Sequence, residues 1–183
     1  MSTLSPNAGS QEFTRSMLNR ALREAVDFIH AEGWGQSHPT LFGLVPSALL
    51  IDALPDPDEA APLTLVVQDF PDNVAPGTVE VMEYLSRVVW PDGVEGAILA
   101  QEIRFRDTSE DGTTGASVRT ARLYSGGLKN GVTATLLQLQ PTEAELAELG
   151  AFGEDEYILR GGPEIAPELE DILVFSLNQT LID

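Results

Sequence analysis

The sequence predicts an α+β fold in a single domain, with a mainly antiparallel sheet of about five strands and with the N-terminal and C-terminal helices packed on one face. Two observations carry this prediction. Apolar residues recur at helical spacing near both ends of the chain, whereas apolar runs and alternating segments fill its middle. Several of these middle segments follow one another without a helix between them, which is typical of antiparallel strands.

The chain of 183 residues has the length of one domain and is long enough to bury a sizeable core. Residues 1–10 are small and polar, and we expect a disordered tail there, followed by the domain at 11–183. Within the domain, the acidic, proline-broken stretch 52–62 and the polar stretch 107–117 are predicted to be flexible loops.

The first helix is predicted over residues 11–32, where one stripe is apolar and Gly33 is placed to end the helix. The stripe consists of Leu18, Leu22, Ala25 and Ile29. A second helix is expected at 77–90, and a capping box predicts a short helix at 141–150. The last helix begins at Pro167, with acidic residues in its first turn.

Strands are predicted from short apolar runs and from alternation. They cover 40–45, 63–70, 95–106, the runs on either side of Asn130-Gly131, and a short segment at 157–161. In the third of these, Ile103 shares one side with other apolar residues, while Glu102 and Arg104 share the opposite side. This alternation predicts a half-buried strand with one polar side.

The glycine-rich segment 124–135 is predicted to be a hairpin with a two-residue turn, because Asn-Gly tolerates positive φ at both turn positions. A phosphate loop of the Walker type is the alternative, but that motif needs a lysine directly after its last glycine, where this sequence has Val132. Uninterrupted pairing from that turn would place Leu123 opposite Gln138. We therefore expect a β-bulge at residues 126–127, which moves Leu123 onto the same side as Leu137.

The net charge of −19 and the absence of cysteine exclude several classes of function. A field of this sign repels phosphate backbones and anionic lipid surfaces, so we expect neither nucleic acid nor membrane as a partner. Without cysteine the chain has no disulfide, no thiolate metal site and no thiol nucleophile. No apolar run is long enough to span a bilayer and the first residues lack a signal-peptide pattern, so we expect a cytoplasmic protein.

The sequence contains no recognisable motif for catalysis, a cofactor or a metal. Its two histidines, His30 and His38, lack metal-ligand spacing, and no serine lies in a nucleophile motif. Trp34 and Trp90 each follow a predicted helix, where large aromatic residues usually close the core; stacking on a ligand is the alternative. We therefore expect no catalytic residue, no cofactor and no metal.

The ten basic residues are unevenly placed along the chain. Five of them fall on or beside three consecutive predicted strands: Arg104, Arg106, Arg119, Arg122 and Lys129. One interpretation is an anion or acidic-peptide site on the sheet, built from Arg104, Arg106, Arg119 and Arg122. The other is a solvated face on which each cation pairs with a neighbouring acid such as Glu102.

Four blocks of the sequence together resemble a family of uncharacterised cytoplasmic proteins found in actinobacteria. The blocks are EGWGQSHPTLFGLVPSALL, VVWPDGVEGAILAQEIRF, ARLYSGGLKNGVTATLLQLQ and LRGGPEIAPELEDILVFSLNQTL. The resemblance covers most of the chain from about residue 20 onward. It implies no activity, cofactor or partner, so it assigns a role to no residue.

Two hypotheses for function follow. The first is a non-enzymatic binding or interaction protein, chaperone-like or adaptor-like, whose partner is another protein or a second copy of itself in a homodimer. The order of its elements looks like the secretion-chaperone type of α+β fold. The second is a small-molecule enzyme or sensor that binds an anionic ligand on an arginine-lined face of the sheet. The second hypothesis requires Arg104, Arg106 and Arg122 to converge on one concave site.

Overall fold

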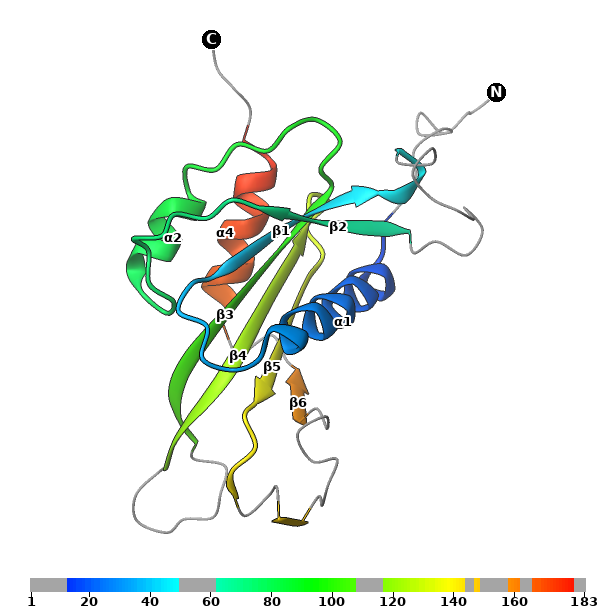
Figure 1. Cartoon of the computed structure of the whole chain (residues 1–183). Helices are drawn as coiled ribbons and strands as arrows, with labels where there is room; N and C mark the ends of the chain where they lie inside the picture. The colour runs from blue at the N-terminus through cyan, green and yellow to red at the C-terminus, as the bar shows by residue number, and fades with distance from the viewer. Residues whose placement is uncertain are drawn as a thin grey trace, which may run out of the picture.

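The structure, a computed structural model, describes residues 13–49, 62–107, 117–143, 147–148, 158–161 and 166–179, with the backbone alone described at 105–107, 117 and 158–161. The predicted tail at 1–10 lies outside these residues, as do nearly all of the predicted loops at 52–62 and 107–117 and half of the predicted short helix at 141–150. The elements are α1 Arg15–Glu32, β1 Thr40–Pro46, β2 Leu63–Gln68, α2 Val79–Leu85, β3 Gly96–Asp107, β4 Ser117–Leu128, β5 Thr133–Leu139, β6 Ile158–Gly161 and α4 Pro167–Leu177 (Figure 1).

The strands form one antiparallel sheet in the order β2-β1-β3-β4-β5-β6. The predicted α+β class with an antiparallel sheet is therefore confirmed, and the short segment at the end of the sheet, β6, brings the strands to six. Chain order is broken once, because the segment that contains α2 carries the chain from β2, at one edge of the sheet, past β1 to β3.

The helices cover opposite faces of the sheet, so the expectation that they share one face is wrong. Gly126 and Gly127 are adjacent in β4 and therefore face opposite sides. A Cβ at Gly126 would lie 3.1 Å from Leu18 of α1, and a Cβ at Gly127 would lie 3.0 Å from Val174 of α4. Figure 1 shows α1 in front of the sheet and α4 behind it. Both faces need cover because adjacent residues of β1 are buried, so the central strands are apolar on both sides.

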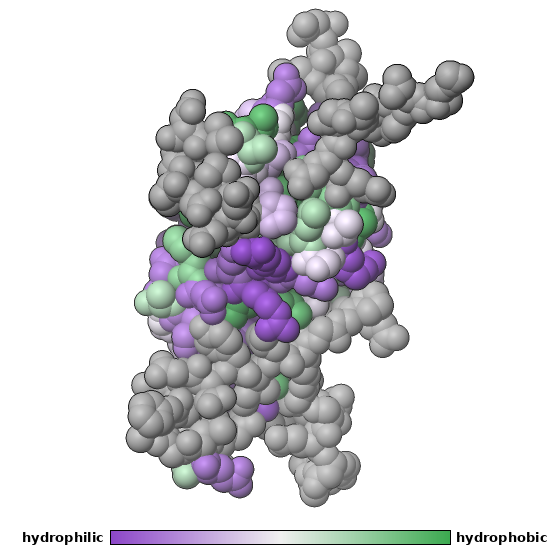
Figure 2. Space-filling model, turned by 90° about the vertical axis from the view of Figure 1, so that its right-hand side faces the viewer, coloured by the Kyte–Doolittle hydropathy of each residue, from purple (hydrophilic) through white to green (hydrophobic). Residues whose placement is uncertain are grey.

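The first helix is amphipathic, as predicted. Thr14 precedes it, and its Oγ1 accepts a hydrogen bond from Met17 N at 3.3 Å; Gly33 ends it with φ of 85°. All four predicted apolar positions are buried against the sheet. The outer side of α1 is polar. Figure 2 shows the molecule from the side on which α1 lies in Figure 1, and hydrophilic residues gather across the middle of that view. The second helix is shorter than the predicted 77–90 and ends at Leu85.

The β4–β5 hairpin has the expected pairing but a different turn. Leu123 lies opposite Leu137, and the pairing is regular through residues 126–127, so the predicted bulge there is wrong. The extra residue lies in the turn: Leu128 N donates to Val132 O at 2.8 Å, which encloses three residues rather than two. Gly131 supplies the only left-handed backbone that this loop needs, with φ of 99°.

Two hydrophobic cores lie on the two faces. The core on the side of α1, here the α1 side, includes Leu22, Phe42, Ile98 and Tyr124. The core on the opposite side, here the α4 side, joins α2 and α4 to alternate residues of the same strands, such as Leu99. Among the residues described, no helix is long and apolar enough to cross a membrane.

The third strand is paired along its full length on only one of its two edges. Its partner β4 follows it from Gly96 to Asp107. Its other partner, β1, begins only at Thr40, which lies opposite Ala100. From Gln101 onward, no strand of the described chain pairs with this edge of β3. We refer to this stretch, Gln101–Asp107 on the side facing β1, as the open edge of β3.

Candidate functional site

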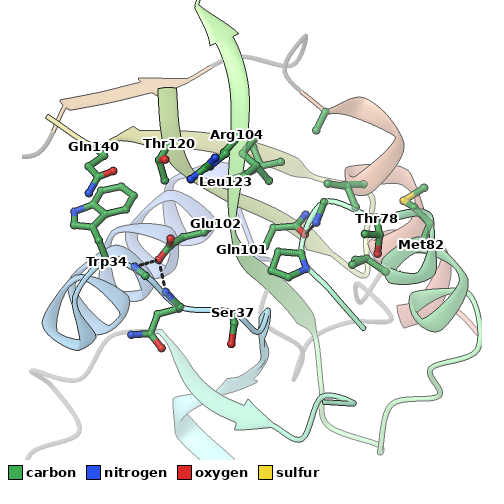
Figure 3. A pocket seen from close by; sticks show the side chains of 18 of the residues that line it. Trp34, Ser37, Thr78, Met82, Gln101, Glu102, Arg104, Thr120, Leu123 and Gln140 are labelled. Atoms are coloured by element: carbon green, nitrogen blue, oxygen red, sulfur yellow. Dashed lines mark hydrogen bonds between the residues drawn. The ribbon is translucent and has the colours of Figure 1, made fainter. Parts of the chain in front are cut away.

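A pocket of about 1180 Å³ surrounds the open edge of β3 where it passes between two loops (Figure 3). One loop, residues 34–37, connects α1 to β1, and the other, residues 76–78, leads into α2. Residues 101–104 of β3 cross the pocket between them. Because successive side chains of a strand point to opposite faces, β3 divides the pocket into two halves.

The half on the α1 side is polar. Its side chains come from the 34–37 loop, β3, β4 and the end of β5: Trp34, Glu102, Arg104, Thr120 and Gln140. Arg104 lies opposite Thr120 in the β3–β4 pair and is exposed. Figure 3 shows these five side chains on one side of β3. We refer to them as the polar half of the pocket.

The half on the α4 side is mainly apolar. Its apolar side chains come from α2, β3, β4 and the start of α4: Val81, Met82, Ile103, Leu123, Ala166 and Leu169. Gln101 lies among them, only 5% exposed, and its Oε1 accepts a hydrogen bond from Gly77 N at 2.7 Å. This bond ties the 76–78 loop to β3. We refer to the six apolar side chains as the apolar half of the pocket.

Glu102 ties the other loop to β3. Its Oε2 accepts hydrogen bonds from Gly35 N at 2.9 Å and from Gln36 N at 2.8 Å (Figure 3). Gly35 has φ of 100°, which favours glycine at this turn. The Nε of Arg122 lies 4.0 Å from the same oxygen. The same carboxylate oxygen therefore accepts two backbone hydrogen bonds and lies at the limit of ion-pair distance from Arg122.

Arg122 is buried beneath Trp34 in a polar network. Its side chain is 1% exposed, and its guanidinium carbon lies 3.8 Å from the centre of the Trp34 ring. Its Nη1 contacts Gln138 Oε1 at 3.2 Å and His30 Nδ1 at 3.3 Å. Gln138 Nε2 also lies 3.2 Å from His30 Nδ1, and Tyr124 donates its hydroxyl to Gln138 Oε1 at 2.8 Å. Since two donors point to His30 Nδ1, this is the unprotonated ring nitrogen in this arrangement.

The four arginines of the predicted anion site do not form one cluster. Arg104 lines the pocket, whereas Arg122 is on the same side but buried behind Trp34. Arg119 faces the α4 side, is 6% exposed and donates from Nη2 to Gln140 O at 2.9 Å. The side chain of Arg106 lies outside the described part of the chain. Of the described arginines, only Arg104 is therefore open to a ligand in the pocket.

Sequence reasoning offered Glu102 as the partner of a neighbouring arginine, but on a solvated face; it missed that this partner, Arg122, is buried, and it missed the position of Trp34. Trp90 packs against the α4-side core, as expected for an aromatic residue after a helix, and its Nε1 donates to Ser176 Oγ at 3.0 Å. Trp34 instead covers a protein cation and lines the pocket. For Glu102, the signal in the sequence was the alternation in 95–106, which placed this residue on the polar side of the strand. That Arg122 is its partner depends on the β3–β4 register.

The pocket is lined by hydroxyl, amide and carboxylate groups, one arginine and several apolar side chains. Within the described ranges, no group of three histidine, aspartate or glutamate side chains could hold a metal ion. Glu102 already receives its hydrogen bonds from the protein's own backbone. Within the described part of the chain, the pocket offers a ligand the open edge of β3, one exposed guanidinium, hydroxyl and amide groups, and an apolar surface.

The fold and the site define a six-stranded antiparallel α+β protein with a pocket built around an open strand edge. A family model described as PPA1309-like protein matches residues 18–178, and the chain belongs to this family. The match covers nearly the same part of the chain as the resemblance seen in the sequence. No curated protein and no solved structure matches the chain.

Proposed function

We propose that this protein binds a segment of another protein in extended conformation along the open edge of β3, as an adaptor or chaperone-like protein. The observation that carries this proposal is that the edge of β3 beyond Ala100, with which no described strand pairs, lies inside the pocket. An unpaired strand edge presents backbone N–H and C=O groups to a further strand. Strand addition supplies affinity through the main chain and specificity through pockets for alternate side chains.

The surroundings of the edge favour a single added strand over a whole sheet. The loops at 34–37 and 76–78 lie on either side of the edge, and both are fixed to β3, through Glu102 and Gln101. An isolated extended segment can lie between them. The two halves of the pocket would then receive its alternate side chains.

A second candidate is an anionic small molecule in the polar half of the pocket. Arg104 favours it, because among the described residues no carboxylate lies within ion-pair distance of its guanidinium. Thr120 and Gln140 add a hydroxyl and an amide beside it. This candidate leaves the open strand edge and the apolar half of the pocket without a role, so we favour the extended segment.

The proposal is tested by filling the pocket. Thr120→Trp places a large ring in the polar half, and aromatic residues are well tolerated in strands. The matched control is Val118→Trp, two residues away on the same side of β4, where the side chain is 61% exposed and does not line the pocket. Both variants are checked for folding by circular dichroism and thermal unfolding.

Each protein is used to select from a phage-displayed library of random octapeptides, and the selected peptides are synthesised with blocked termini. We expect the unsubstituted protein and Val118→Trp to bind them alike, and Thr120→Trp to bind at least about tenfold more weakly, a loss of about 1.4 kcal/mol. Equal binding by Thr120→Trp, or the absence of any selected peptide, would contradict the proposal.

A further inference from the structure

The chemistry of the pocket also defines the segment that fits it. Resting on the function proposed above, we propose that the bound segment alternates apolar side chains with polar ones, and that one of the polar side chains is a carboxylate that pairs with Arg104. The partner is thus an extended segment with one acidic residue at a fixed position, flanked by neutral or basic residues.

The alternation follows from the two halves of the pocket. A strand added to β3 points its successive side chains to the α1 side and to the α4 side in turn. On the α4 side they meet Ile103, Leu123 and Leu169, which form an apolar surface. On the α1 side they meet Arg104, Thr120 and Gln140, which offer charge and hydrogen bonds. A segment of uniform chemistry would leave one of the two halves poorly matched.

The position of the acidic residue follows from the charges that are already paired. Glu102 accepts two backbone hydrogen bonds and lies 4.0 Å from Arg122 Nε, so its carboxylate is already engaged by groups of the protein. Arg104 is exposed, and no described carboxylate lies within ion-pair distance of it. A side chain on the neighbouring strand directly opposite Arg104 would lie within reach of its guanidinium, where opposite charges attract.

Other charges restrict the carboxylate to that one place. Glu168, at the start of α4, lines the pocket on the α4 side and would repel an acidic side chain there. The net charge of −19 disfavours a partner that is acidic throughout. The same charge opposes a second copy of this chain as the occupant, and a second copy would also bring its own flanking loops to the edge. A single acidic residue between neutral or basic neighbours satisfies both the local cation and the overall field.

The test compares the peptides selected by three proteins from the random octapeptide library: the unsubstituted chain, Arg104→Glu and Lys129→Glu. The last is a matched control, because Lys129 is exposed in the β4–β5 turn, outside the pocket, and its replacement changes the net charge equally. We expect the unsubstituted chain and Lys129→Glu to enrich alternating sequences with Asp or Glu at one polar position. Arg104→Glu should enrich Lys or Arg at that position.

Binding measurements with the synthesised peptides complete the test. Peptides selected by the unsubstituted chain should bind Arg104→Glu at least about tenfold more weakly, since a charge-assisted hydrogen bond becomes a repulsion. Arg104→Lys should retain part of the affinity, because it keeps the charge but loses the planar fork of the guanidinium.

The outcomes separate this inference from the proposed function. Alternating peptides without an acidic preference, or a preference that Arg104→Glu leaves unchanged, would overturn the inference while strand addition stands. The absence of peptides whose binding depends on the pocket would overturn both. A concentration-dependent dimer in light scattering that Thr120→Trp abolishes would identify a second copy as the occupant and likewise overturn the inference.

Discussion

The two sides of the β3–β4 pair are built from alternate residues of the same two strands, and they differ in what they bury. On the α1 side, Glu102 and Arg122 lie opposite each other and join a network of polar side chains beneath Trp34. On the α4 side, Ile103 and Leu123 belong to an apolar cluster with residues of β5 and α4. One pair of strands therefore supplies both halves of the pocket.

The difference teaches that the two sides contribute different properties. Burying charges has a large desolvation penalty, and an ion pair recovers it only with good geometry. The polar network on the α1 side is therefore expected to add little net stability. Burying apolar surface is favourable in proportion to its area. We infer that the α4 side stabilises the β3–β4 pair, and that the α1 side fixes the loop at 34–37 and the chemistry of the polar half.

The largest effect is expected from Glu102→Gln. The amide keeps an oxygen for the N–H groups of Gly35 and Gln36, but it removes the charge that compensates Arg122. A buried cation without its partner destabilises a protein by about 3–5 kcal/mol, and we expect about 3 kcal/mol because Glu102 retains some contact with solvent. The measurement is the free energy of unfolding in urea.

The double variant Glu102→Gln, Arg122→Met serves as the control for this prediction. With the cation also removed, the double variant should be more stable than Glu102→Gln alone, because no uncompensated charge stays buried. If the two substitutions destabilise additively, the pair is not coupled and the α1 side is better described as a set of independent polar groups.

A smaller effect is expected from Leu123→Ala on the α4 side. Leu123 is 5% exposed, and its removal leaves a cavity in the apolar cluster. Buried leucine-to-alanine changes lower the free energy of unfolding by about 2–5 kcal/mol, and we expect about 2 kcal/mol because this site borders the pocket and can relax. Val118→Ala, an exposed site on the α1 side of the same strand, should change stability by less than about 0.5 kcal/mol. Equal losses in the two variants would contradict the assigned burial.

The smallest effect concerns pH and lies on α1, away from the strand pair. Burial raises the pKa of the Glu24 carboxyl above its ordinary value; Arg20, 4.0 Å away, lowers it, and Asp27 raises it further. Because the folded state holds this proton more tightly than the unfolded state, stability falls as pH rises from the ordinary glutamate pKa through the raised one. The penalty is fully present above both values.

Glu24→Gln removes this penalty. Its stability relative to the unsubstituted protein should therefore rise as pH increases from about 4 to 7, by about 0.5 kcal/mol or less because the side chain is partly exposed. Urea unfolding at several pH values measures the difference. A difference that shrinks with rising pH would have the wrong sign.

Local patterns predicted much of the fold. The apolar stripe and Gly33 located α1, the alternation in 95–106 located β3 and its polar side, and Asn-Gly located the β4–β5 turn. The turn itself was predicted with one residue too few, since the left-handed position needed only Gly131. The pairing of Leu123 with Leu137 was nevertheless correct, because matching apolar sides constrains register more strongly than turn type does.

The sequence by itself determined the α+β class, the antiparallel strands, the amphipathic first helix and the polar side of β3, because each depends on side chains close together along the chain. Only the tertiary structure decided that α1 and α4 lie on opposite faces, that Arg122 is buried beneath Trp34, and that β1 stops opposite Ala100 and leaves an open edge. These features depend on contacts between distant segments, such as Glu102 with Gly35. Local periodicity specifies which side of an element is apolar, whereas the partner of each side is chosen by the packing of the whole chain.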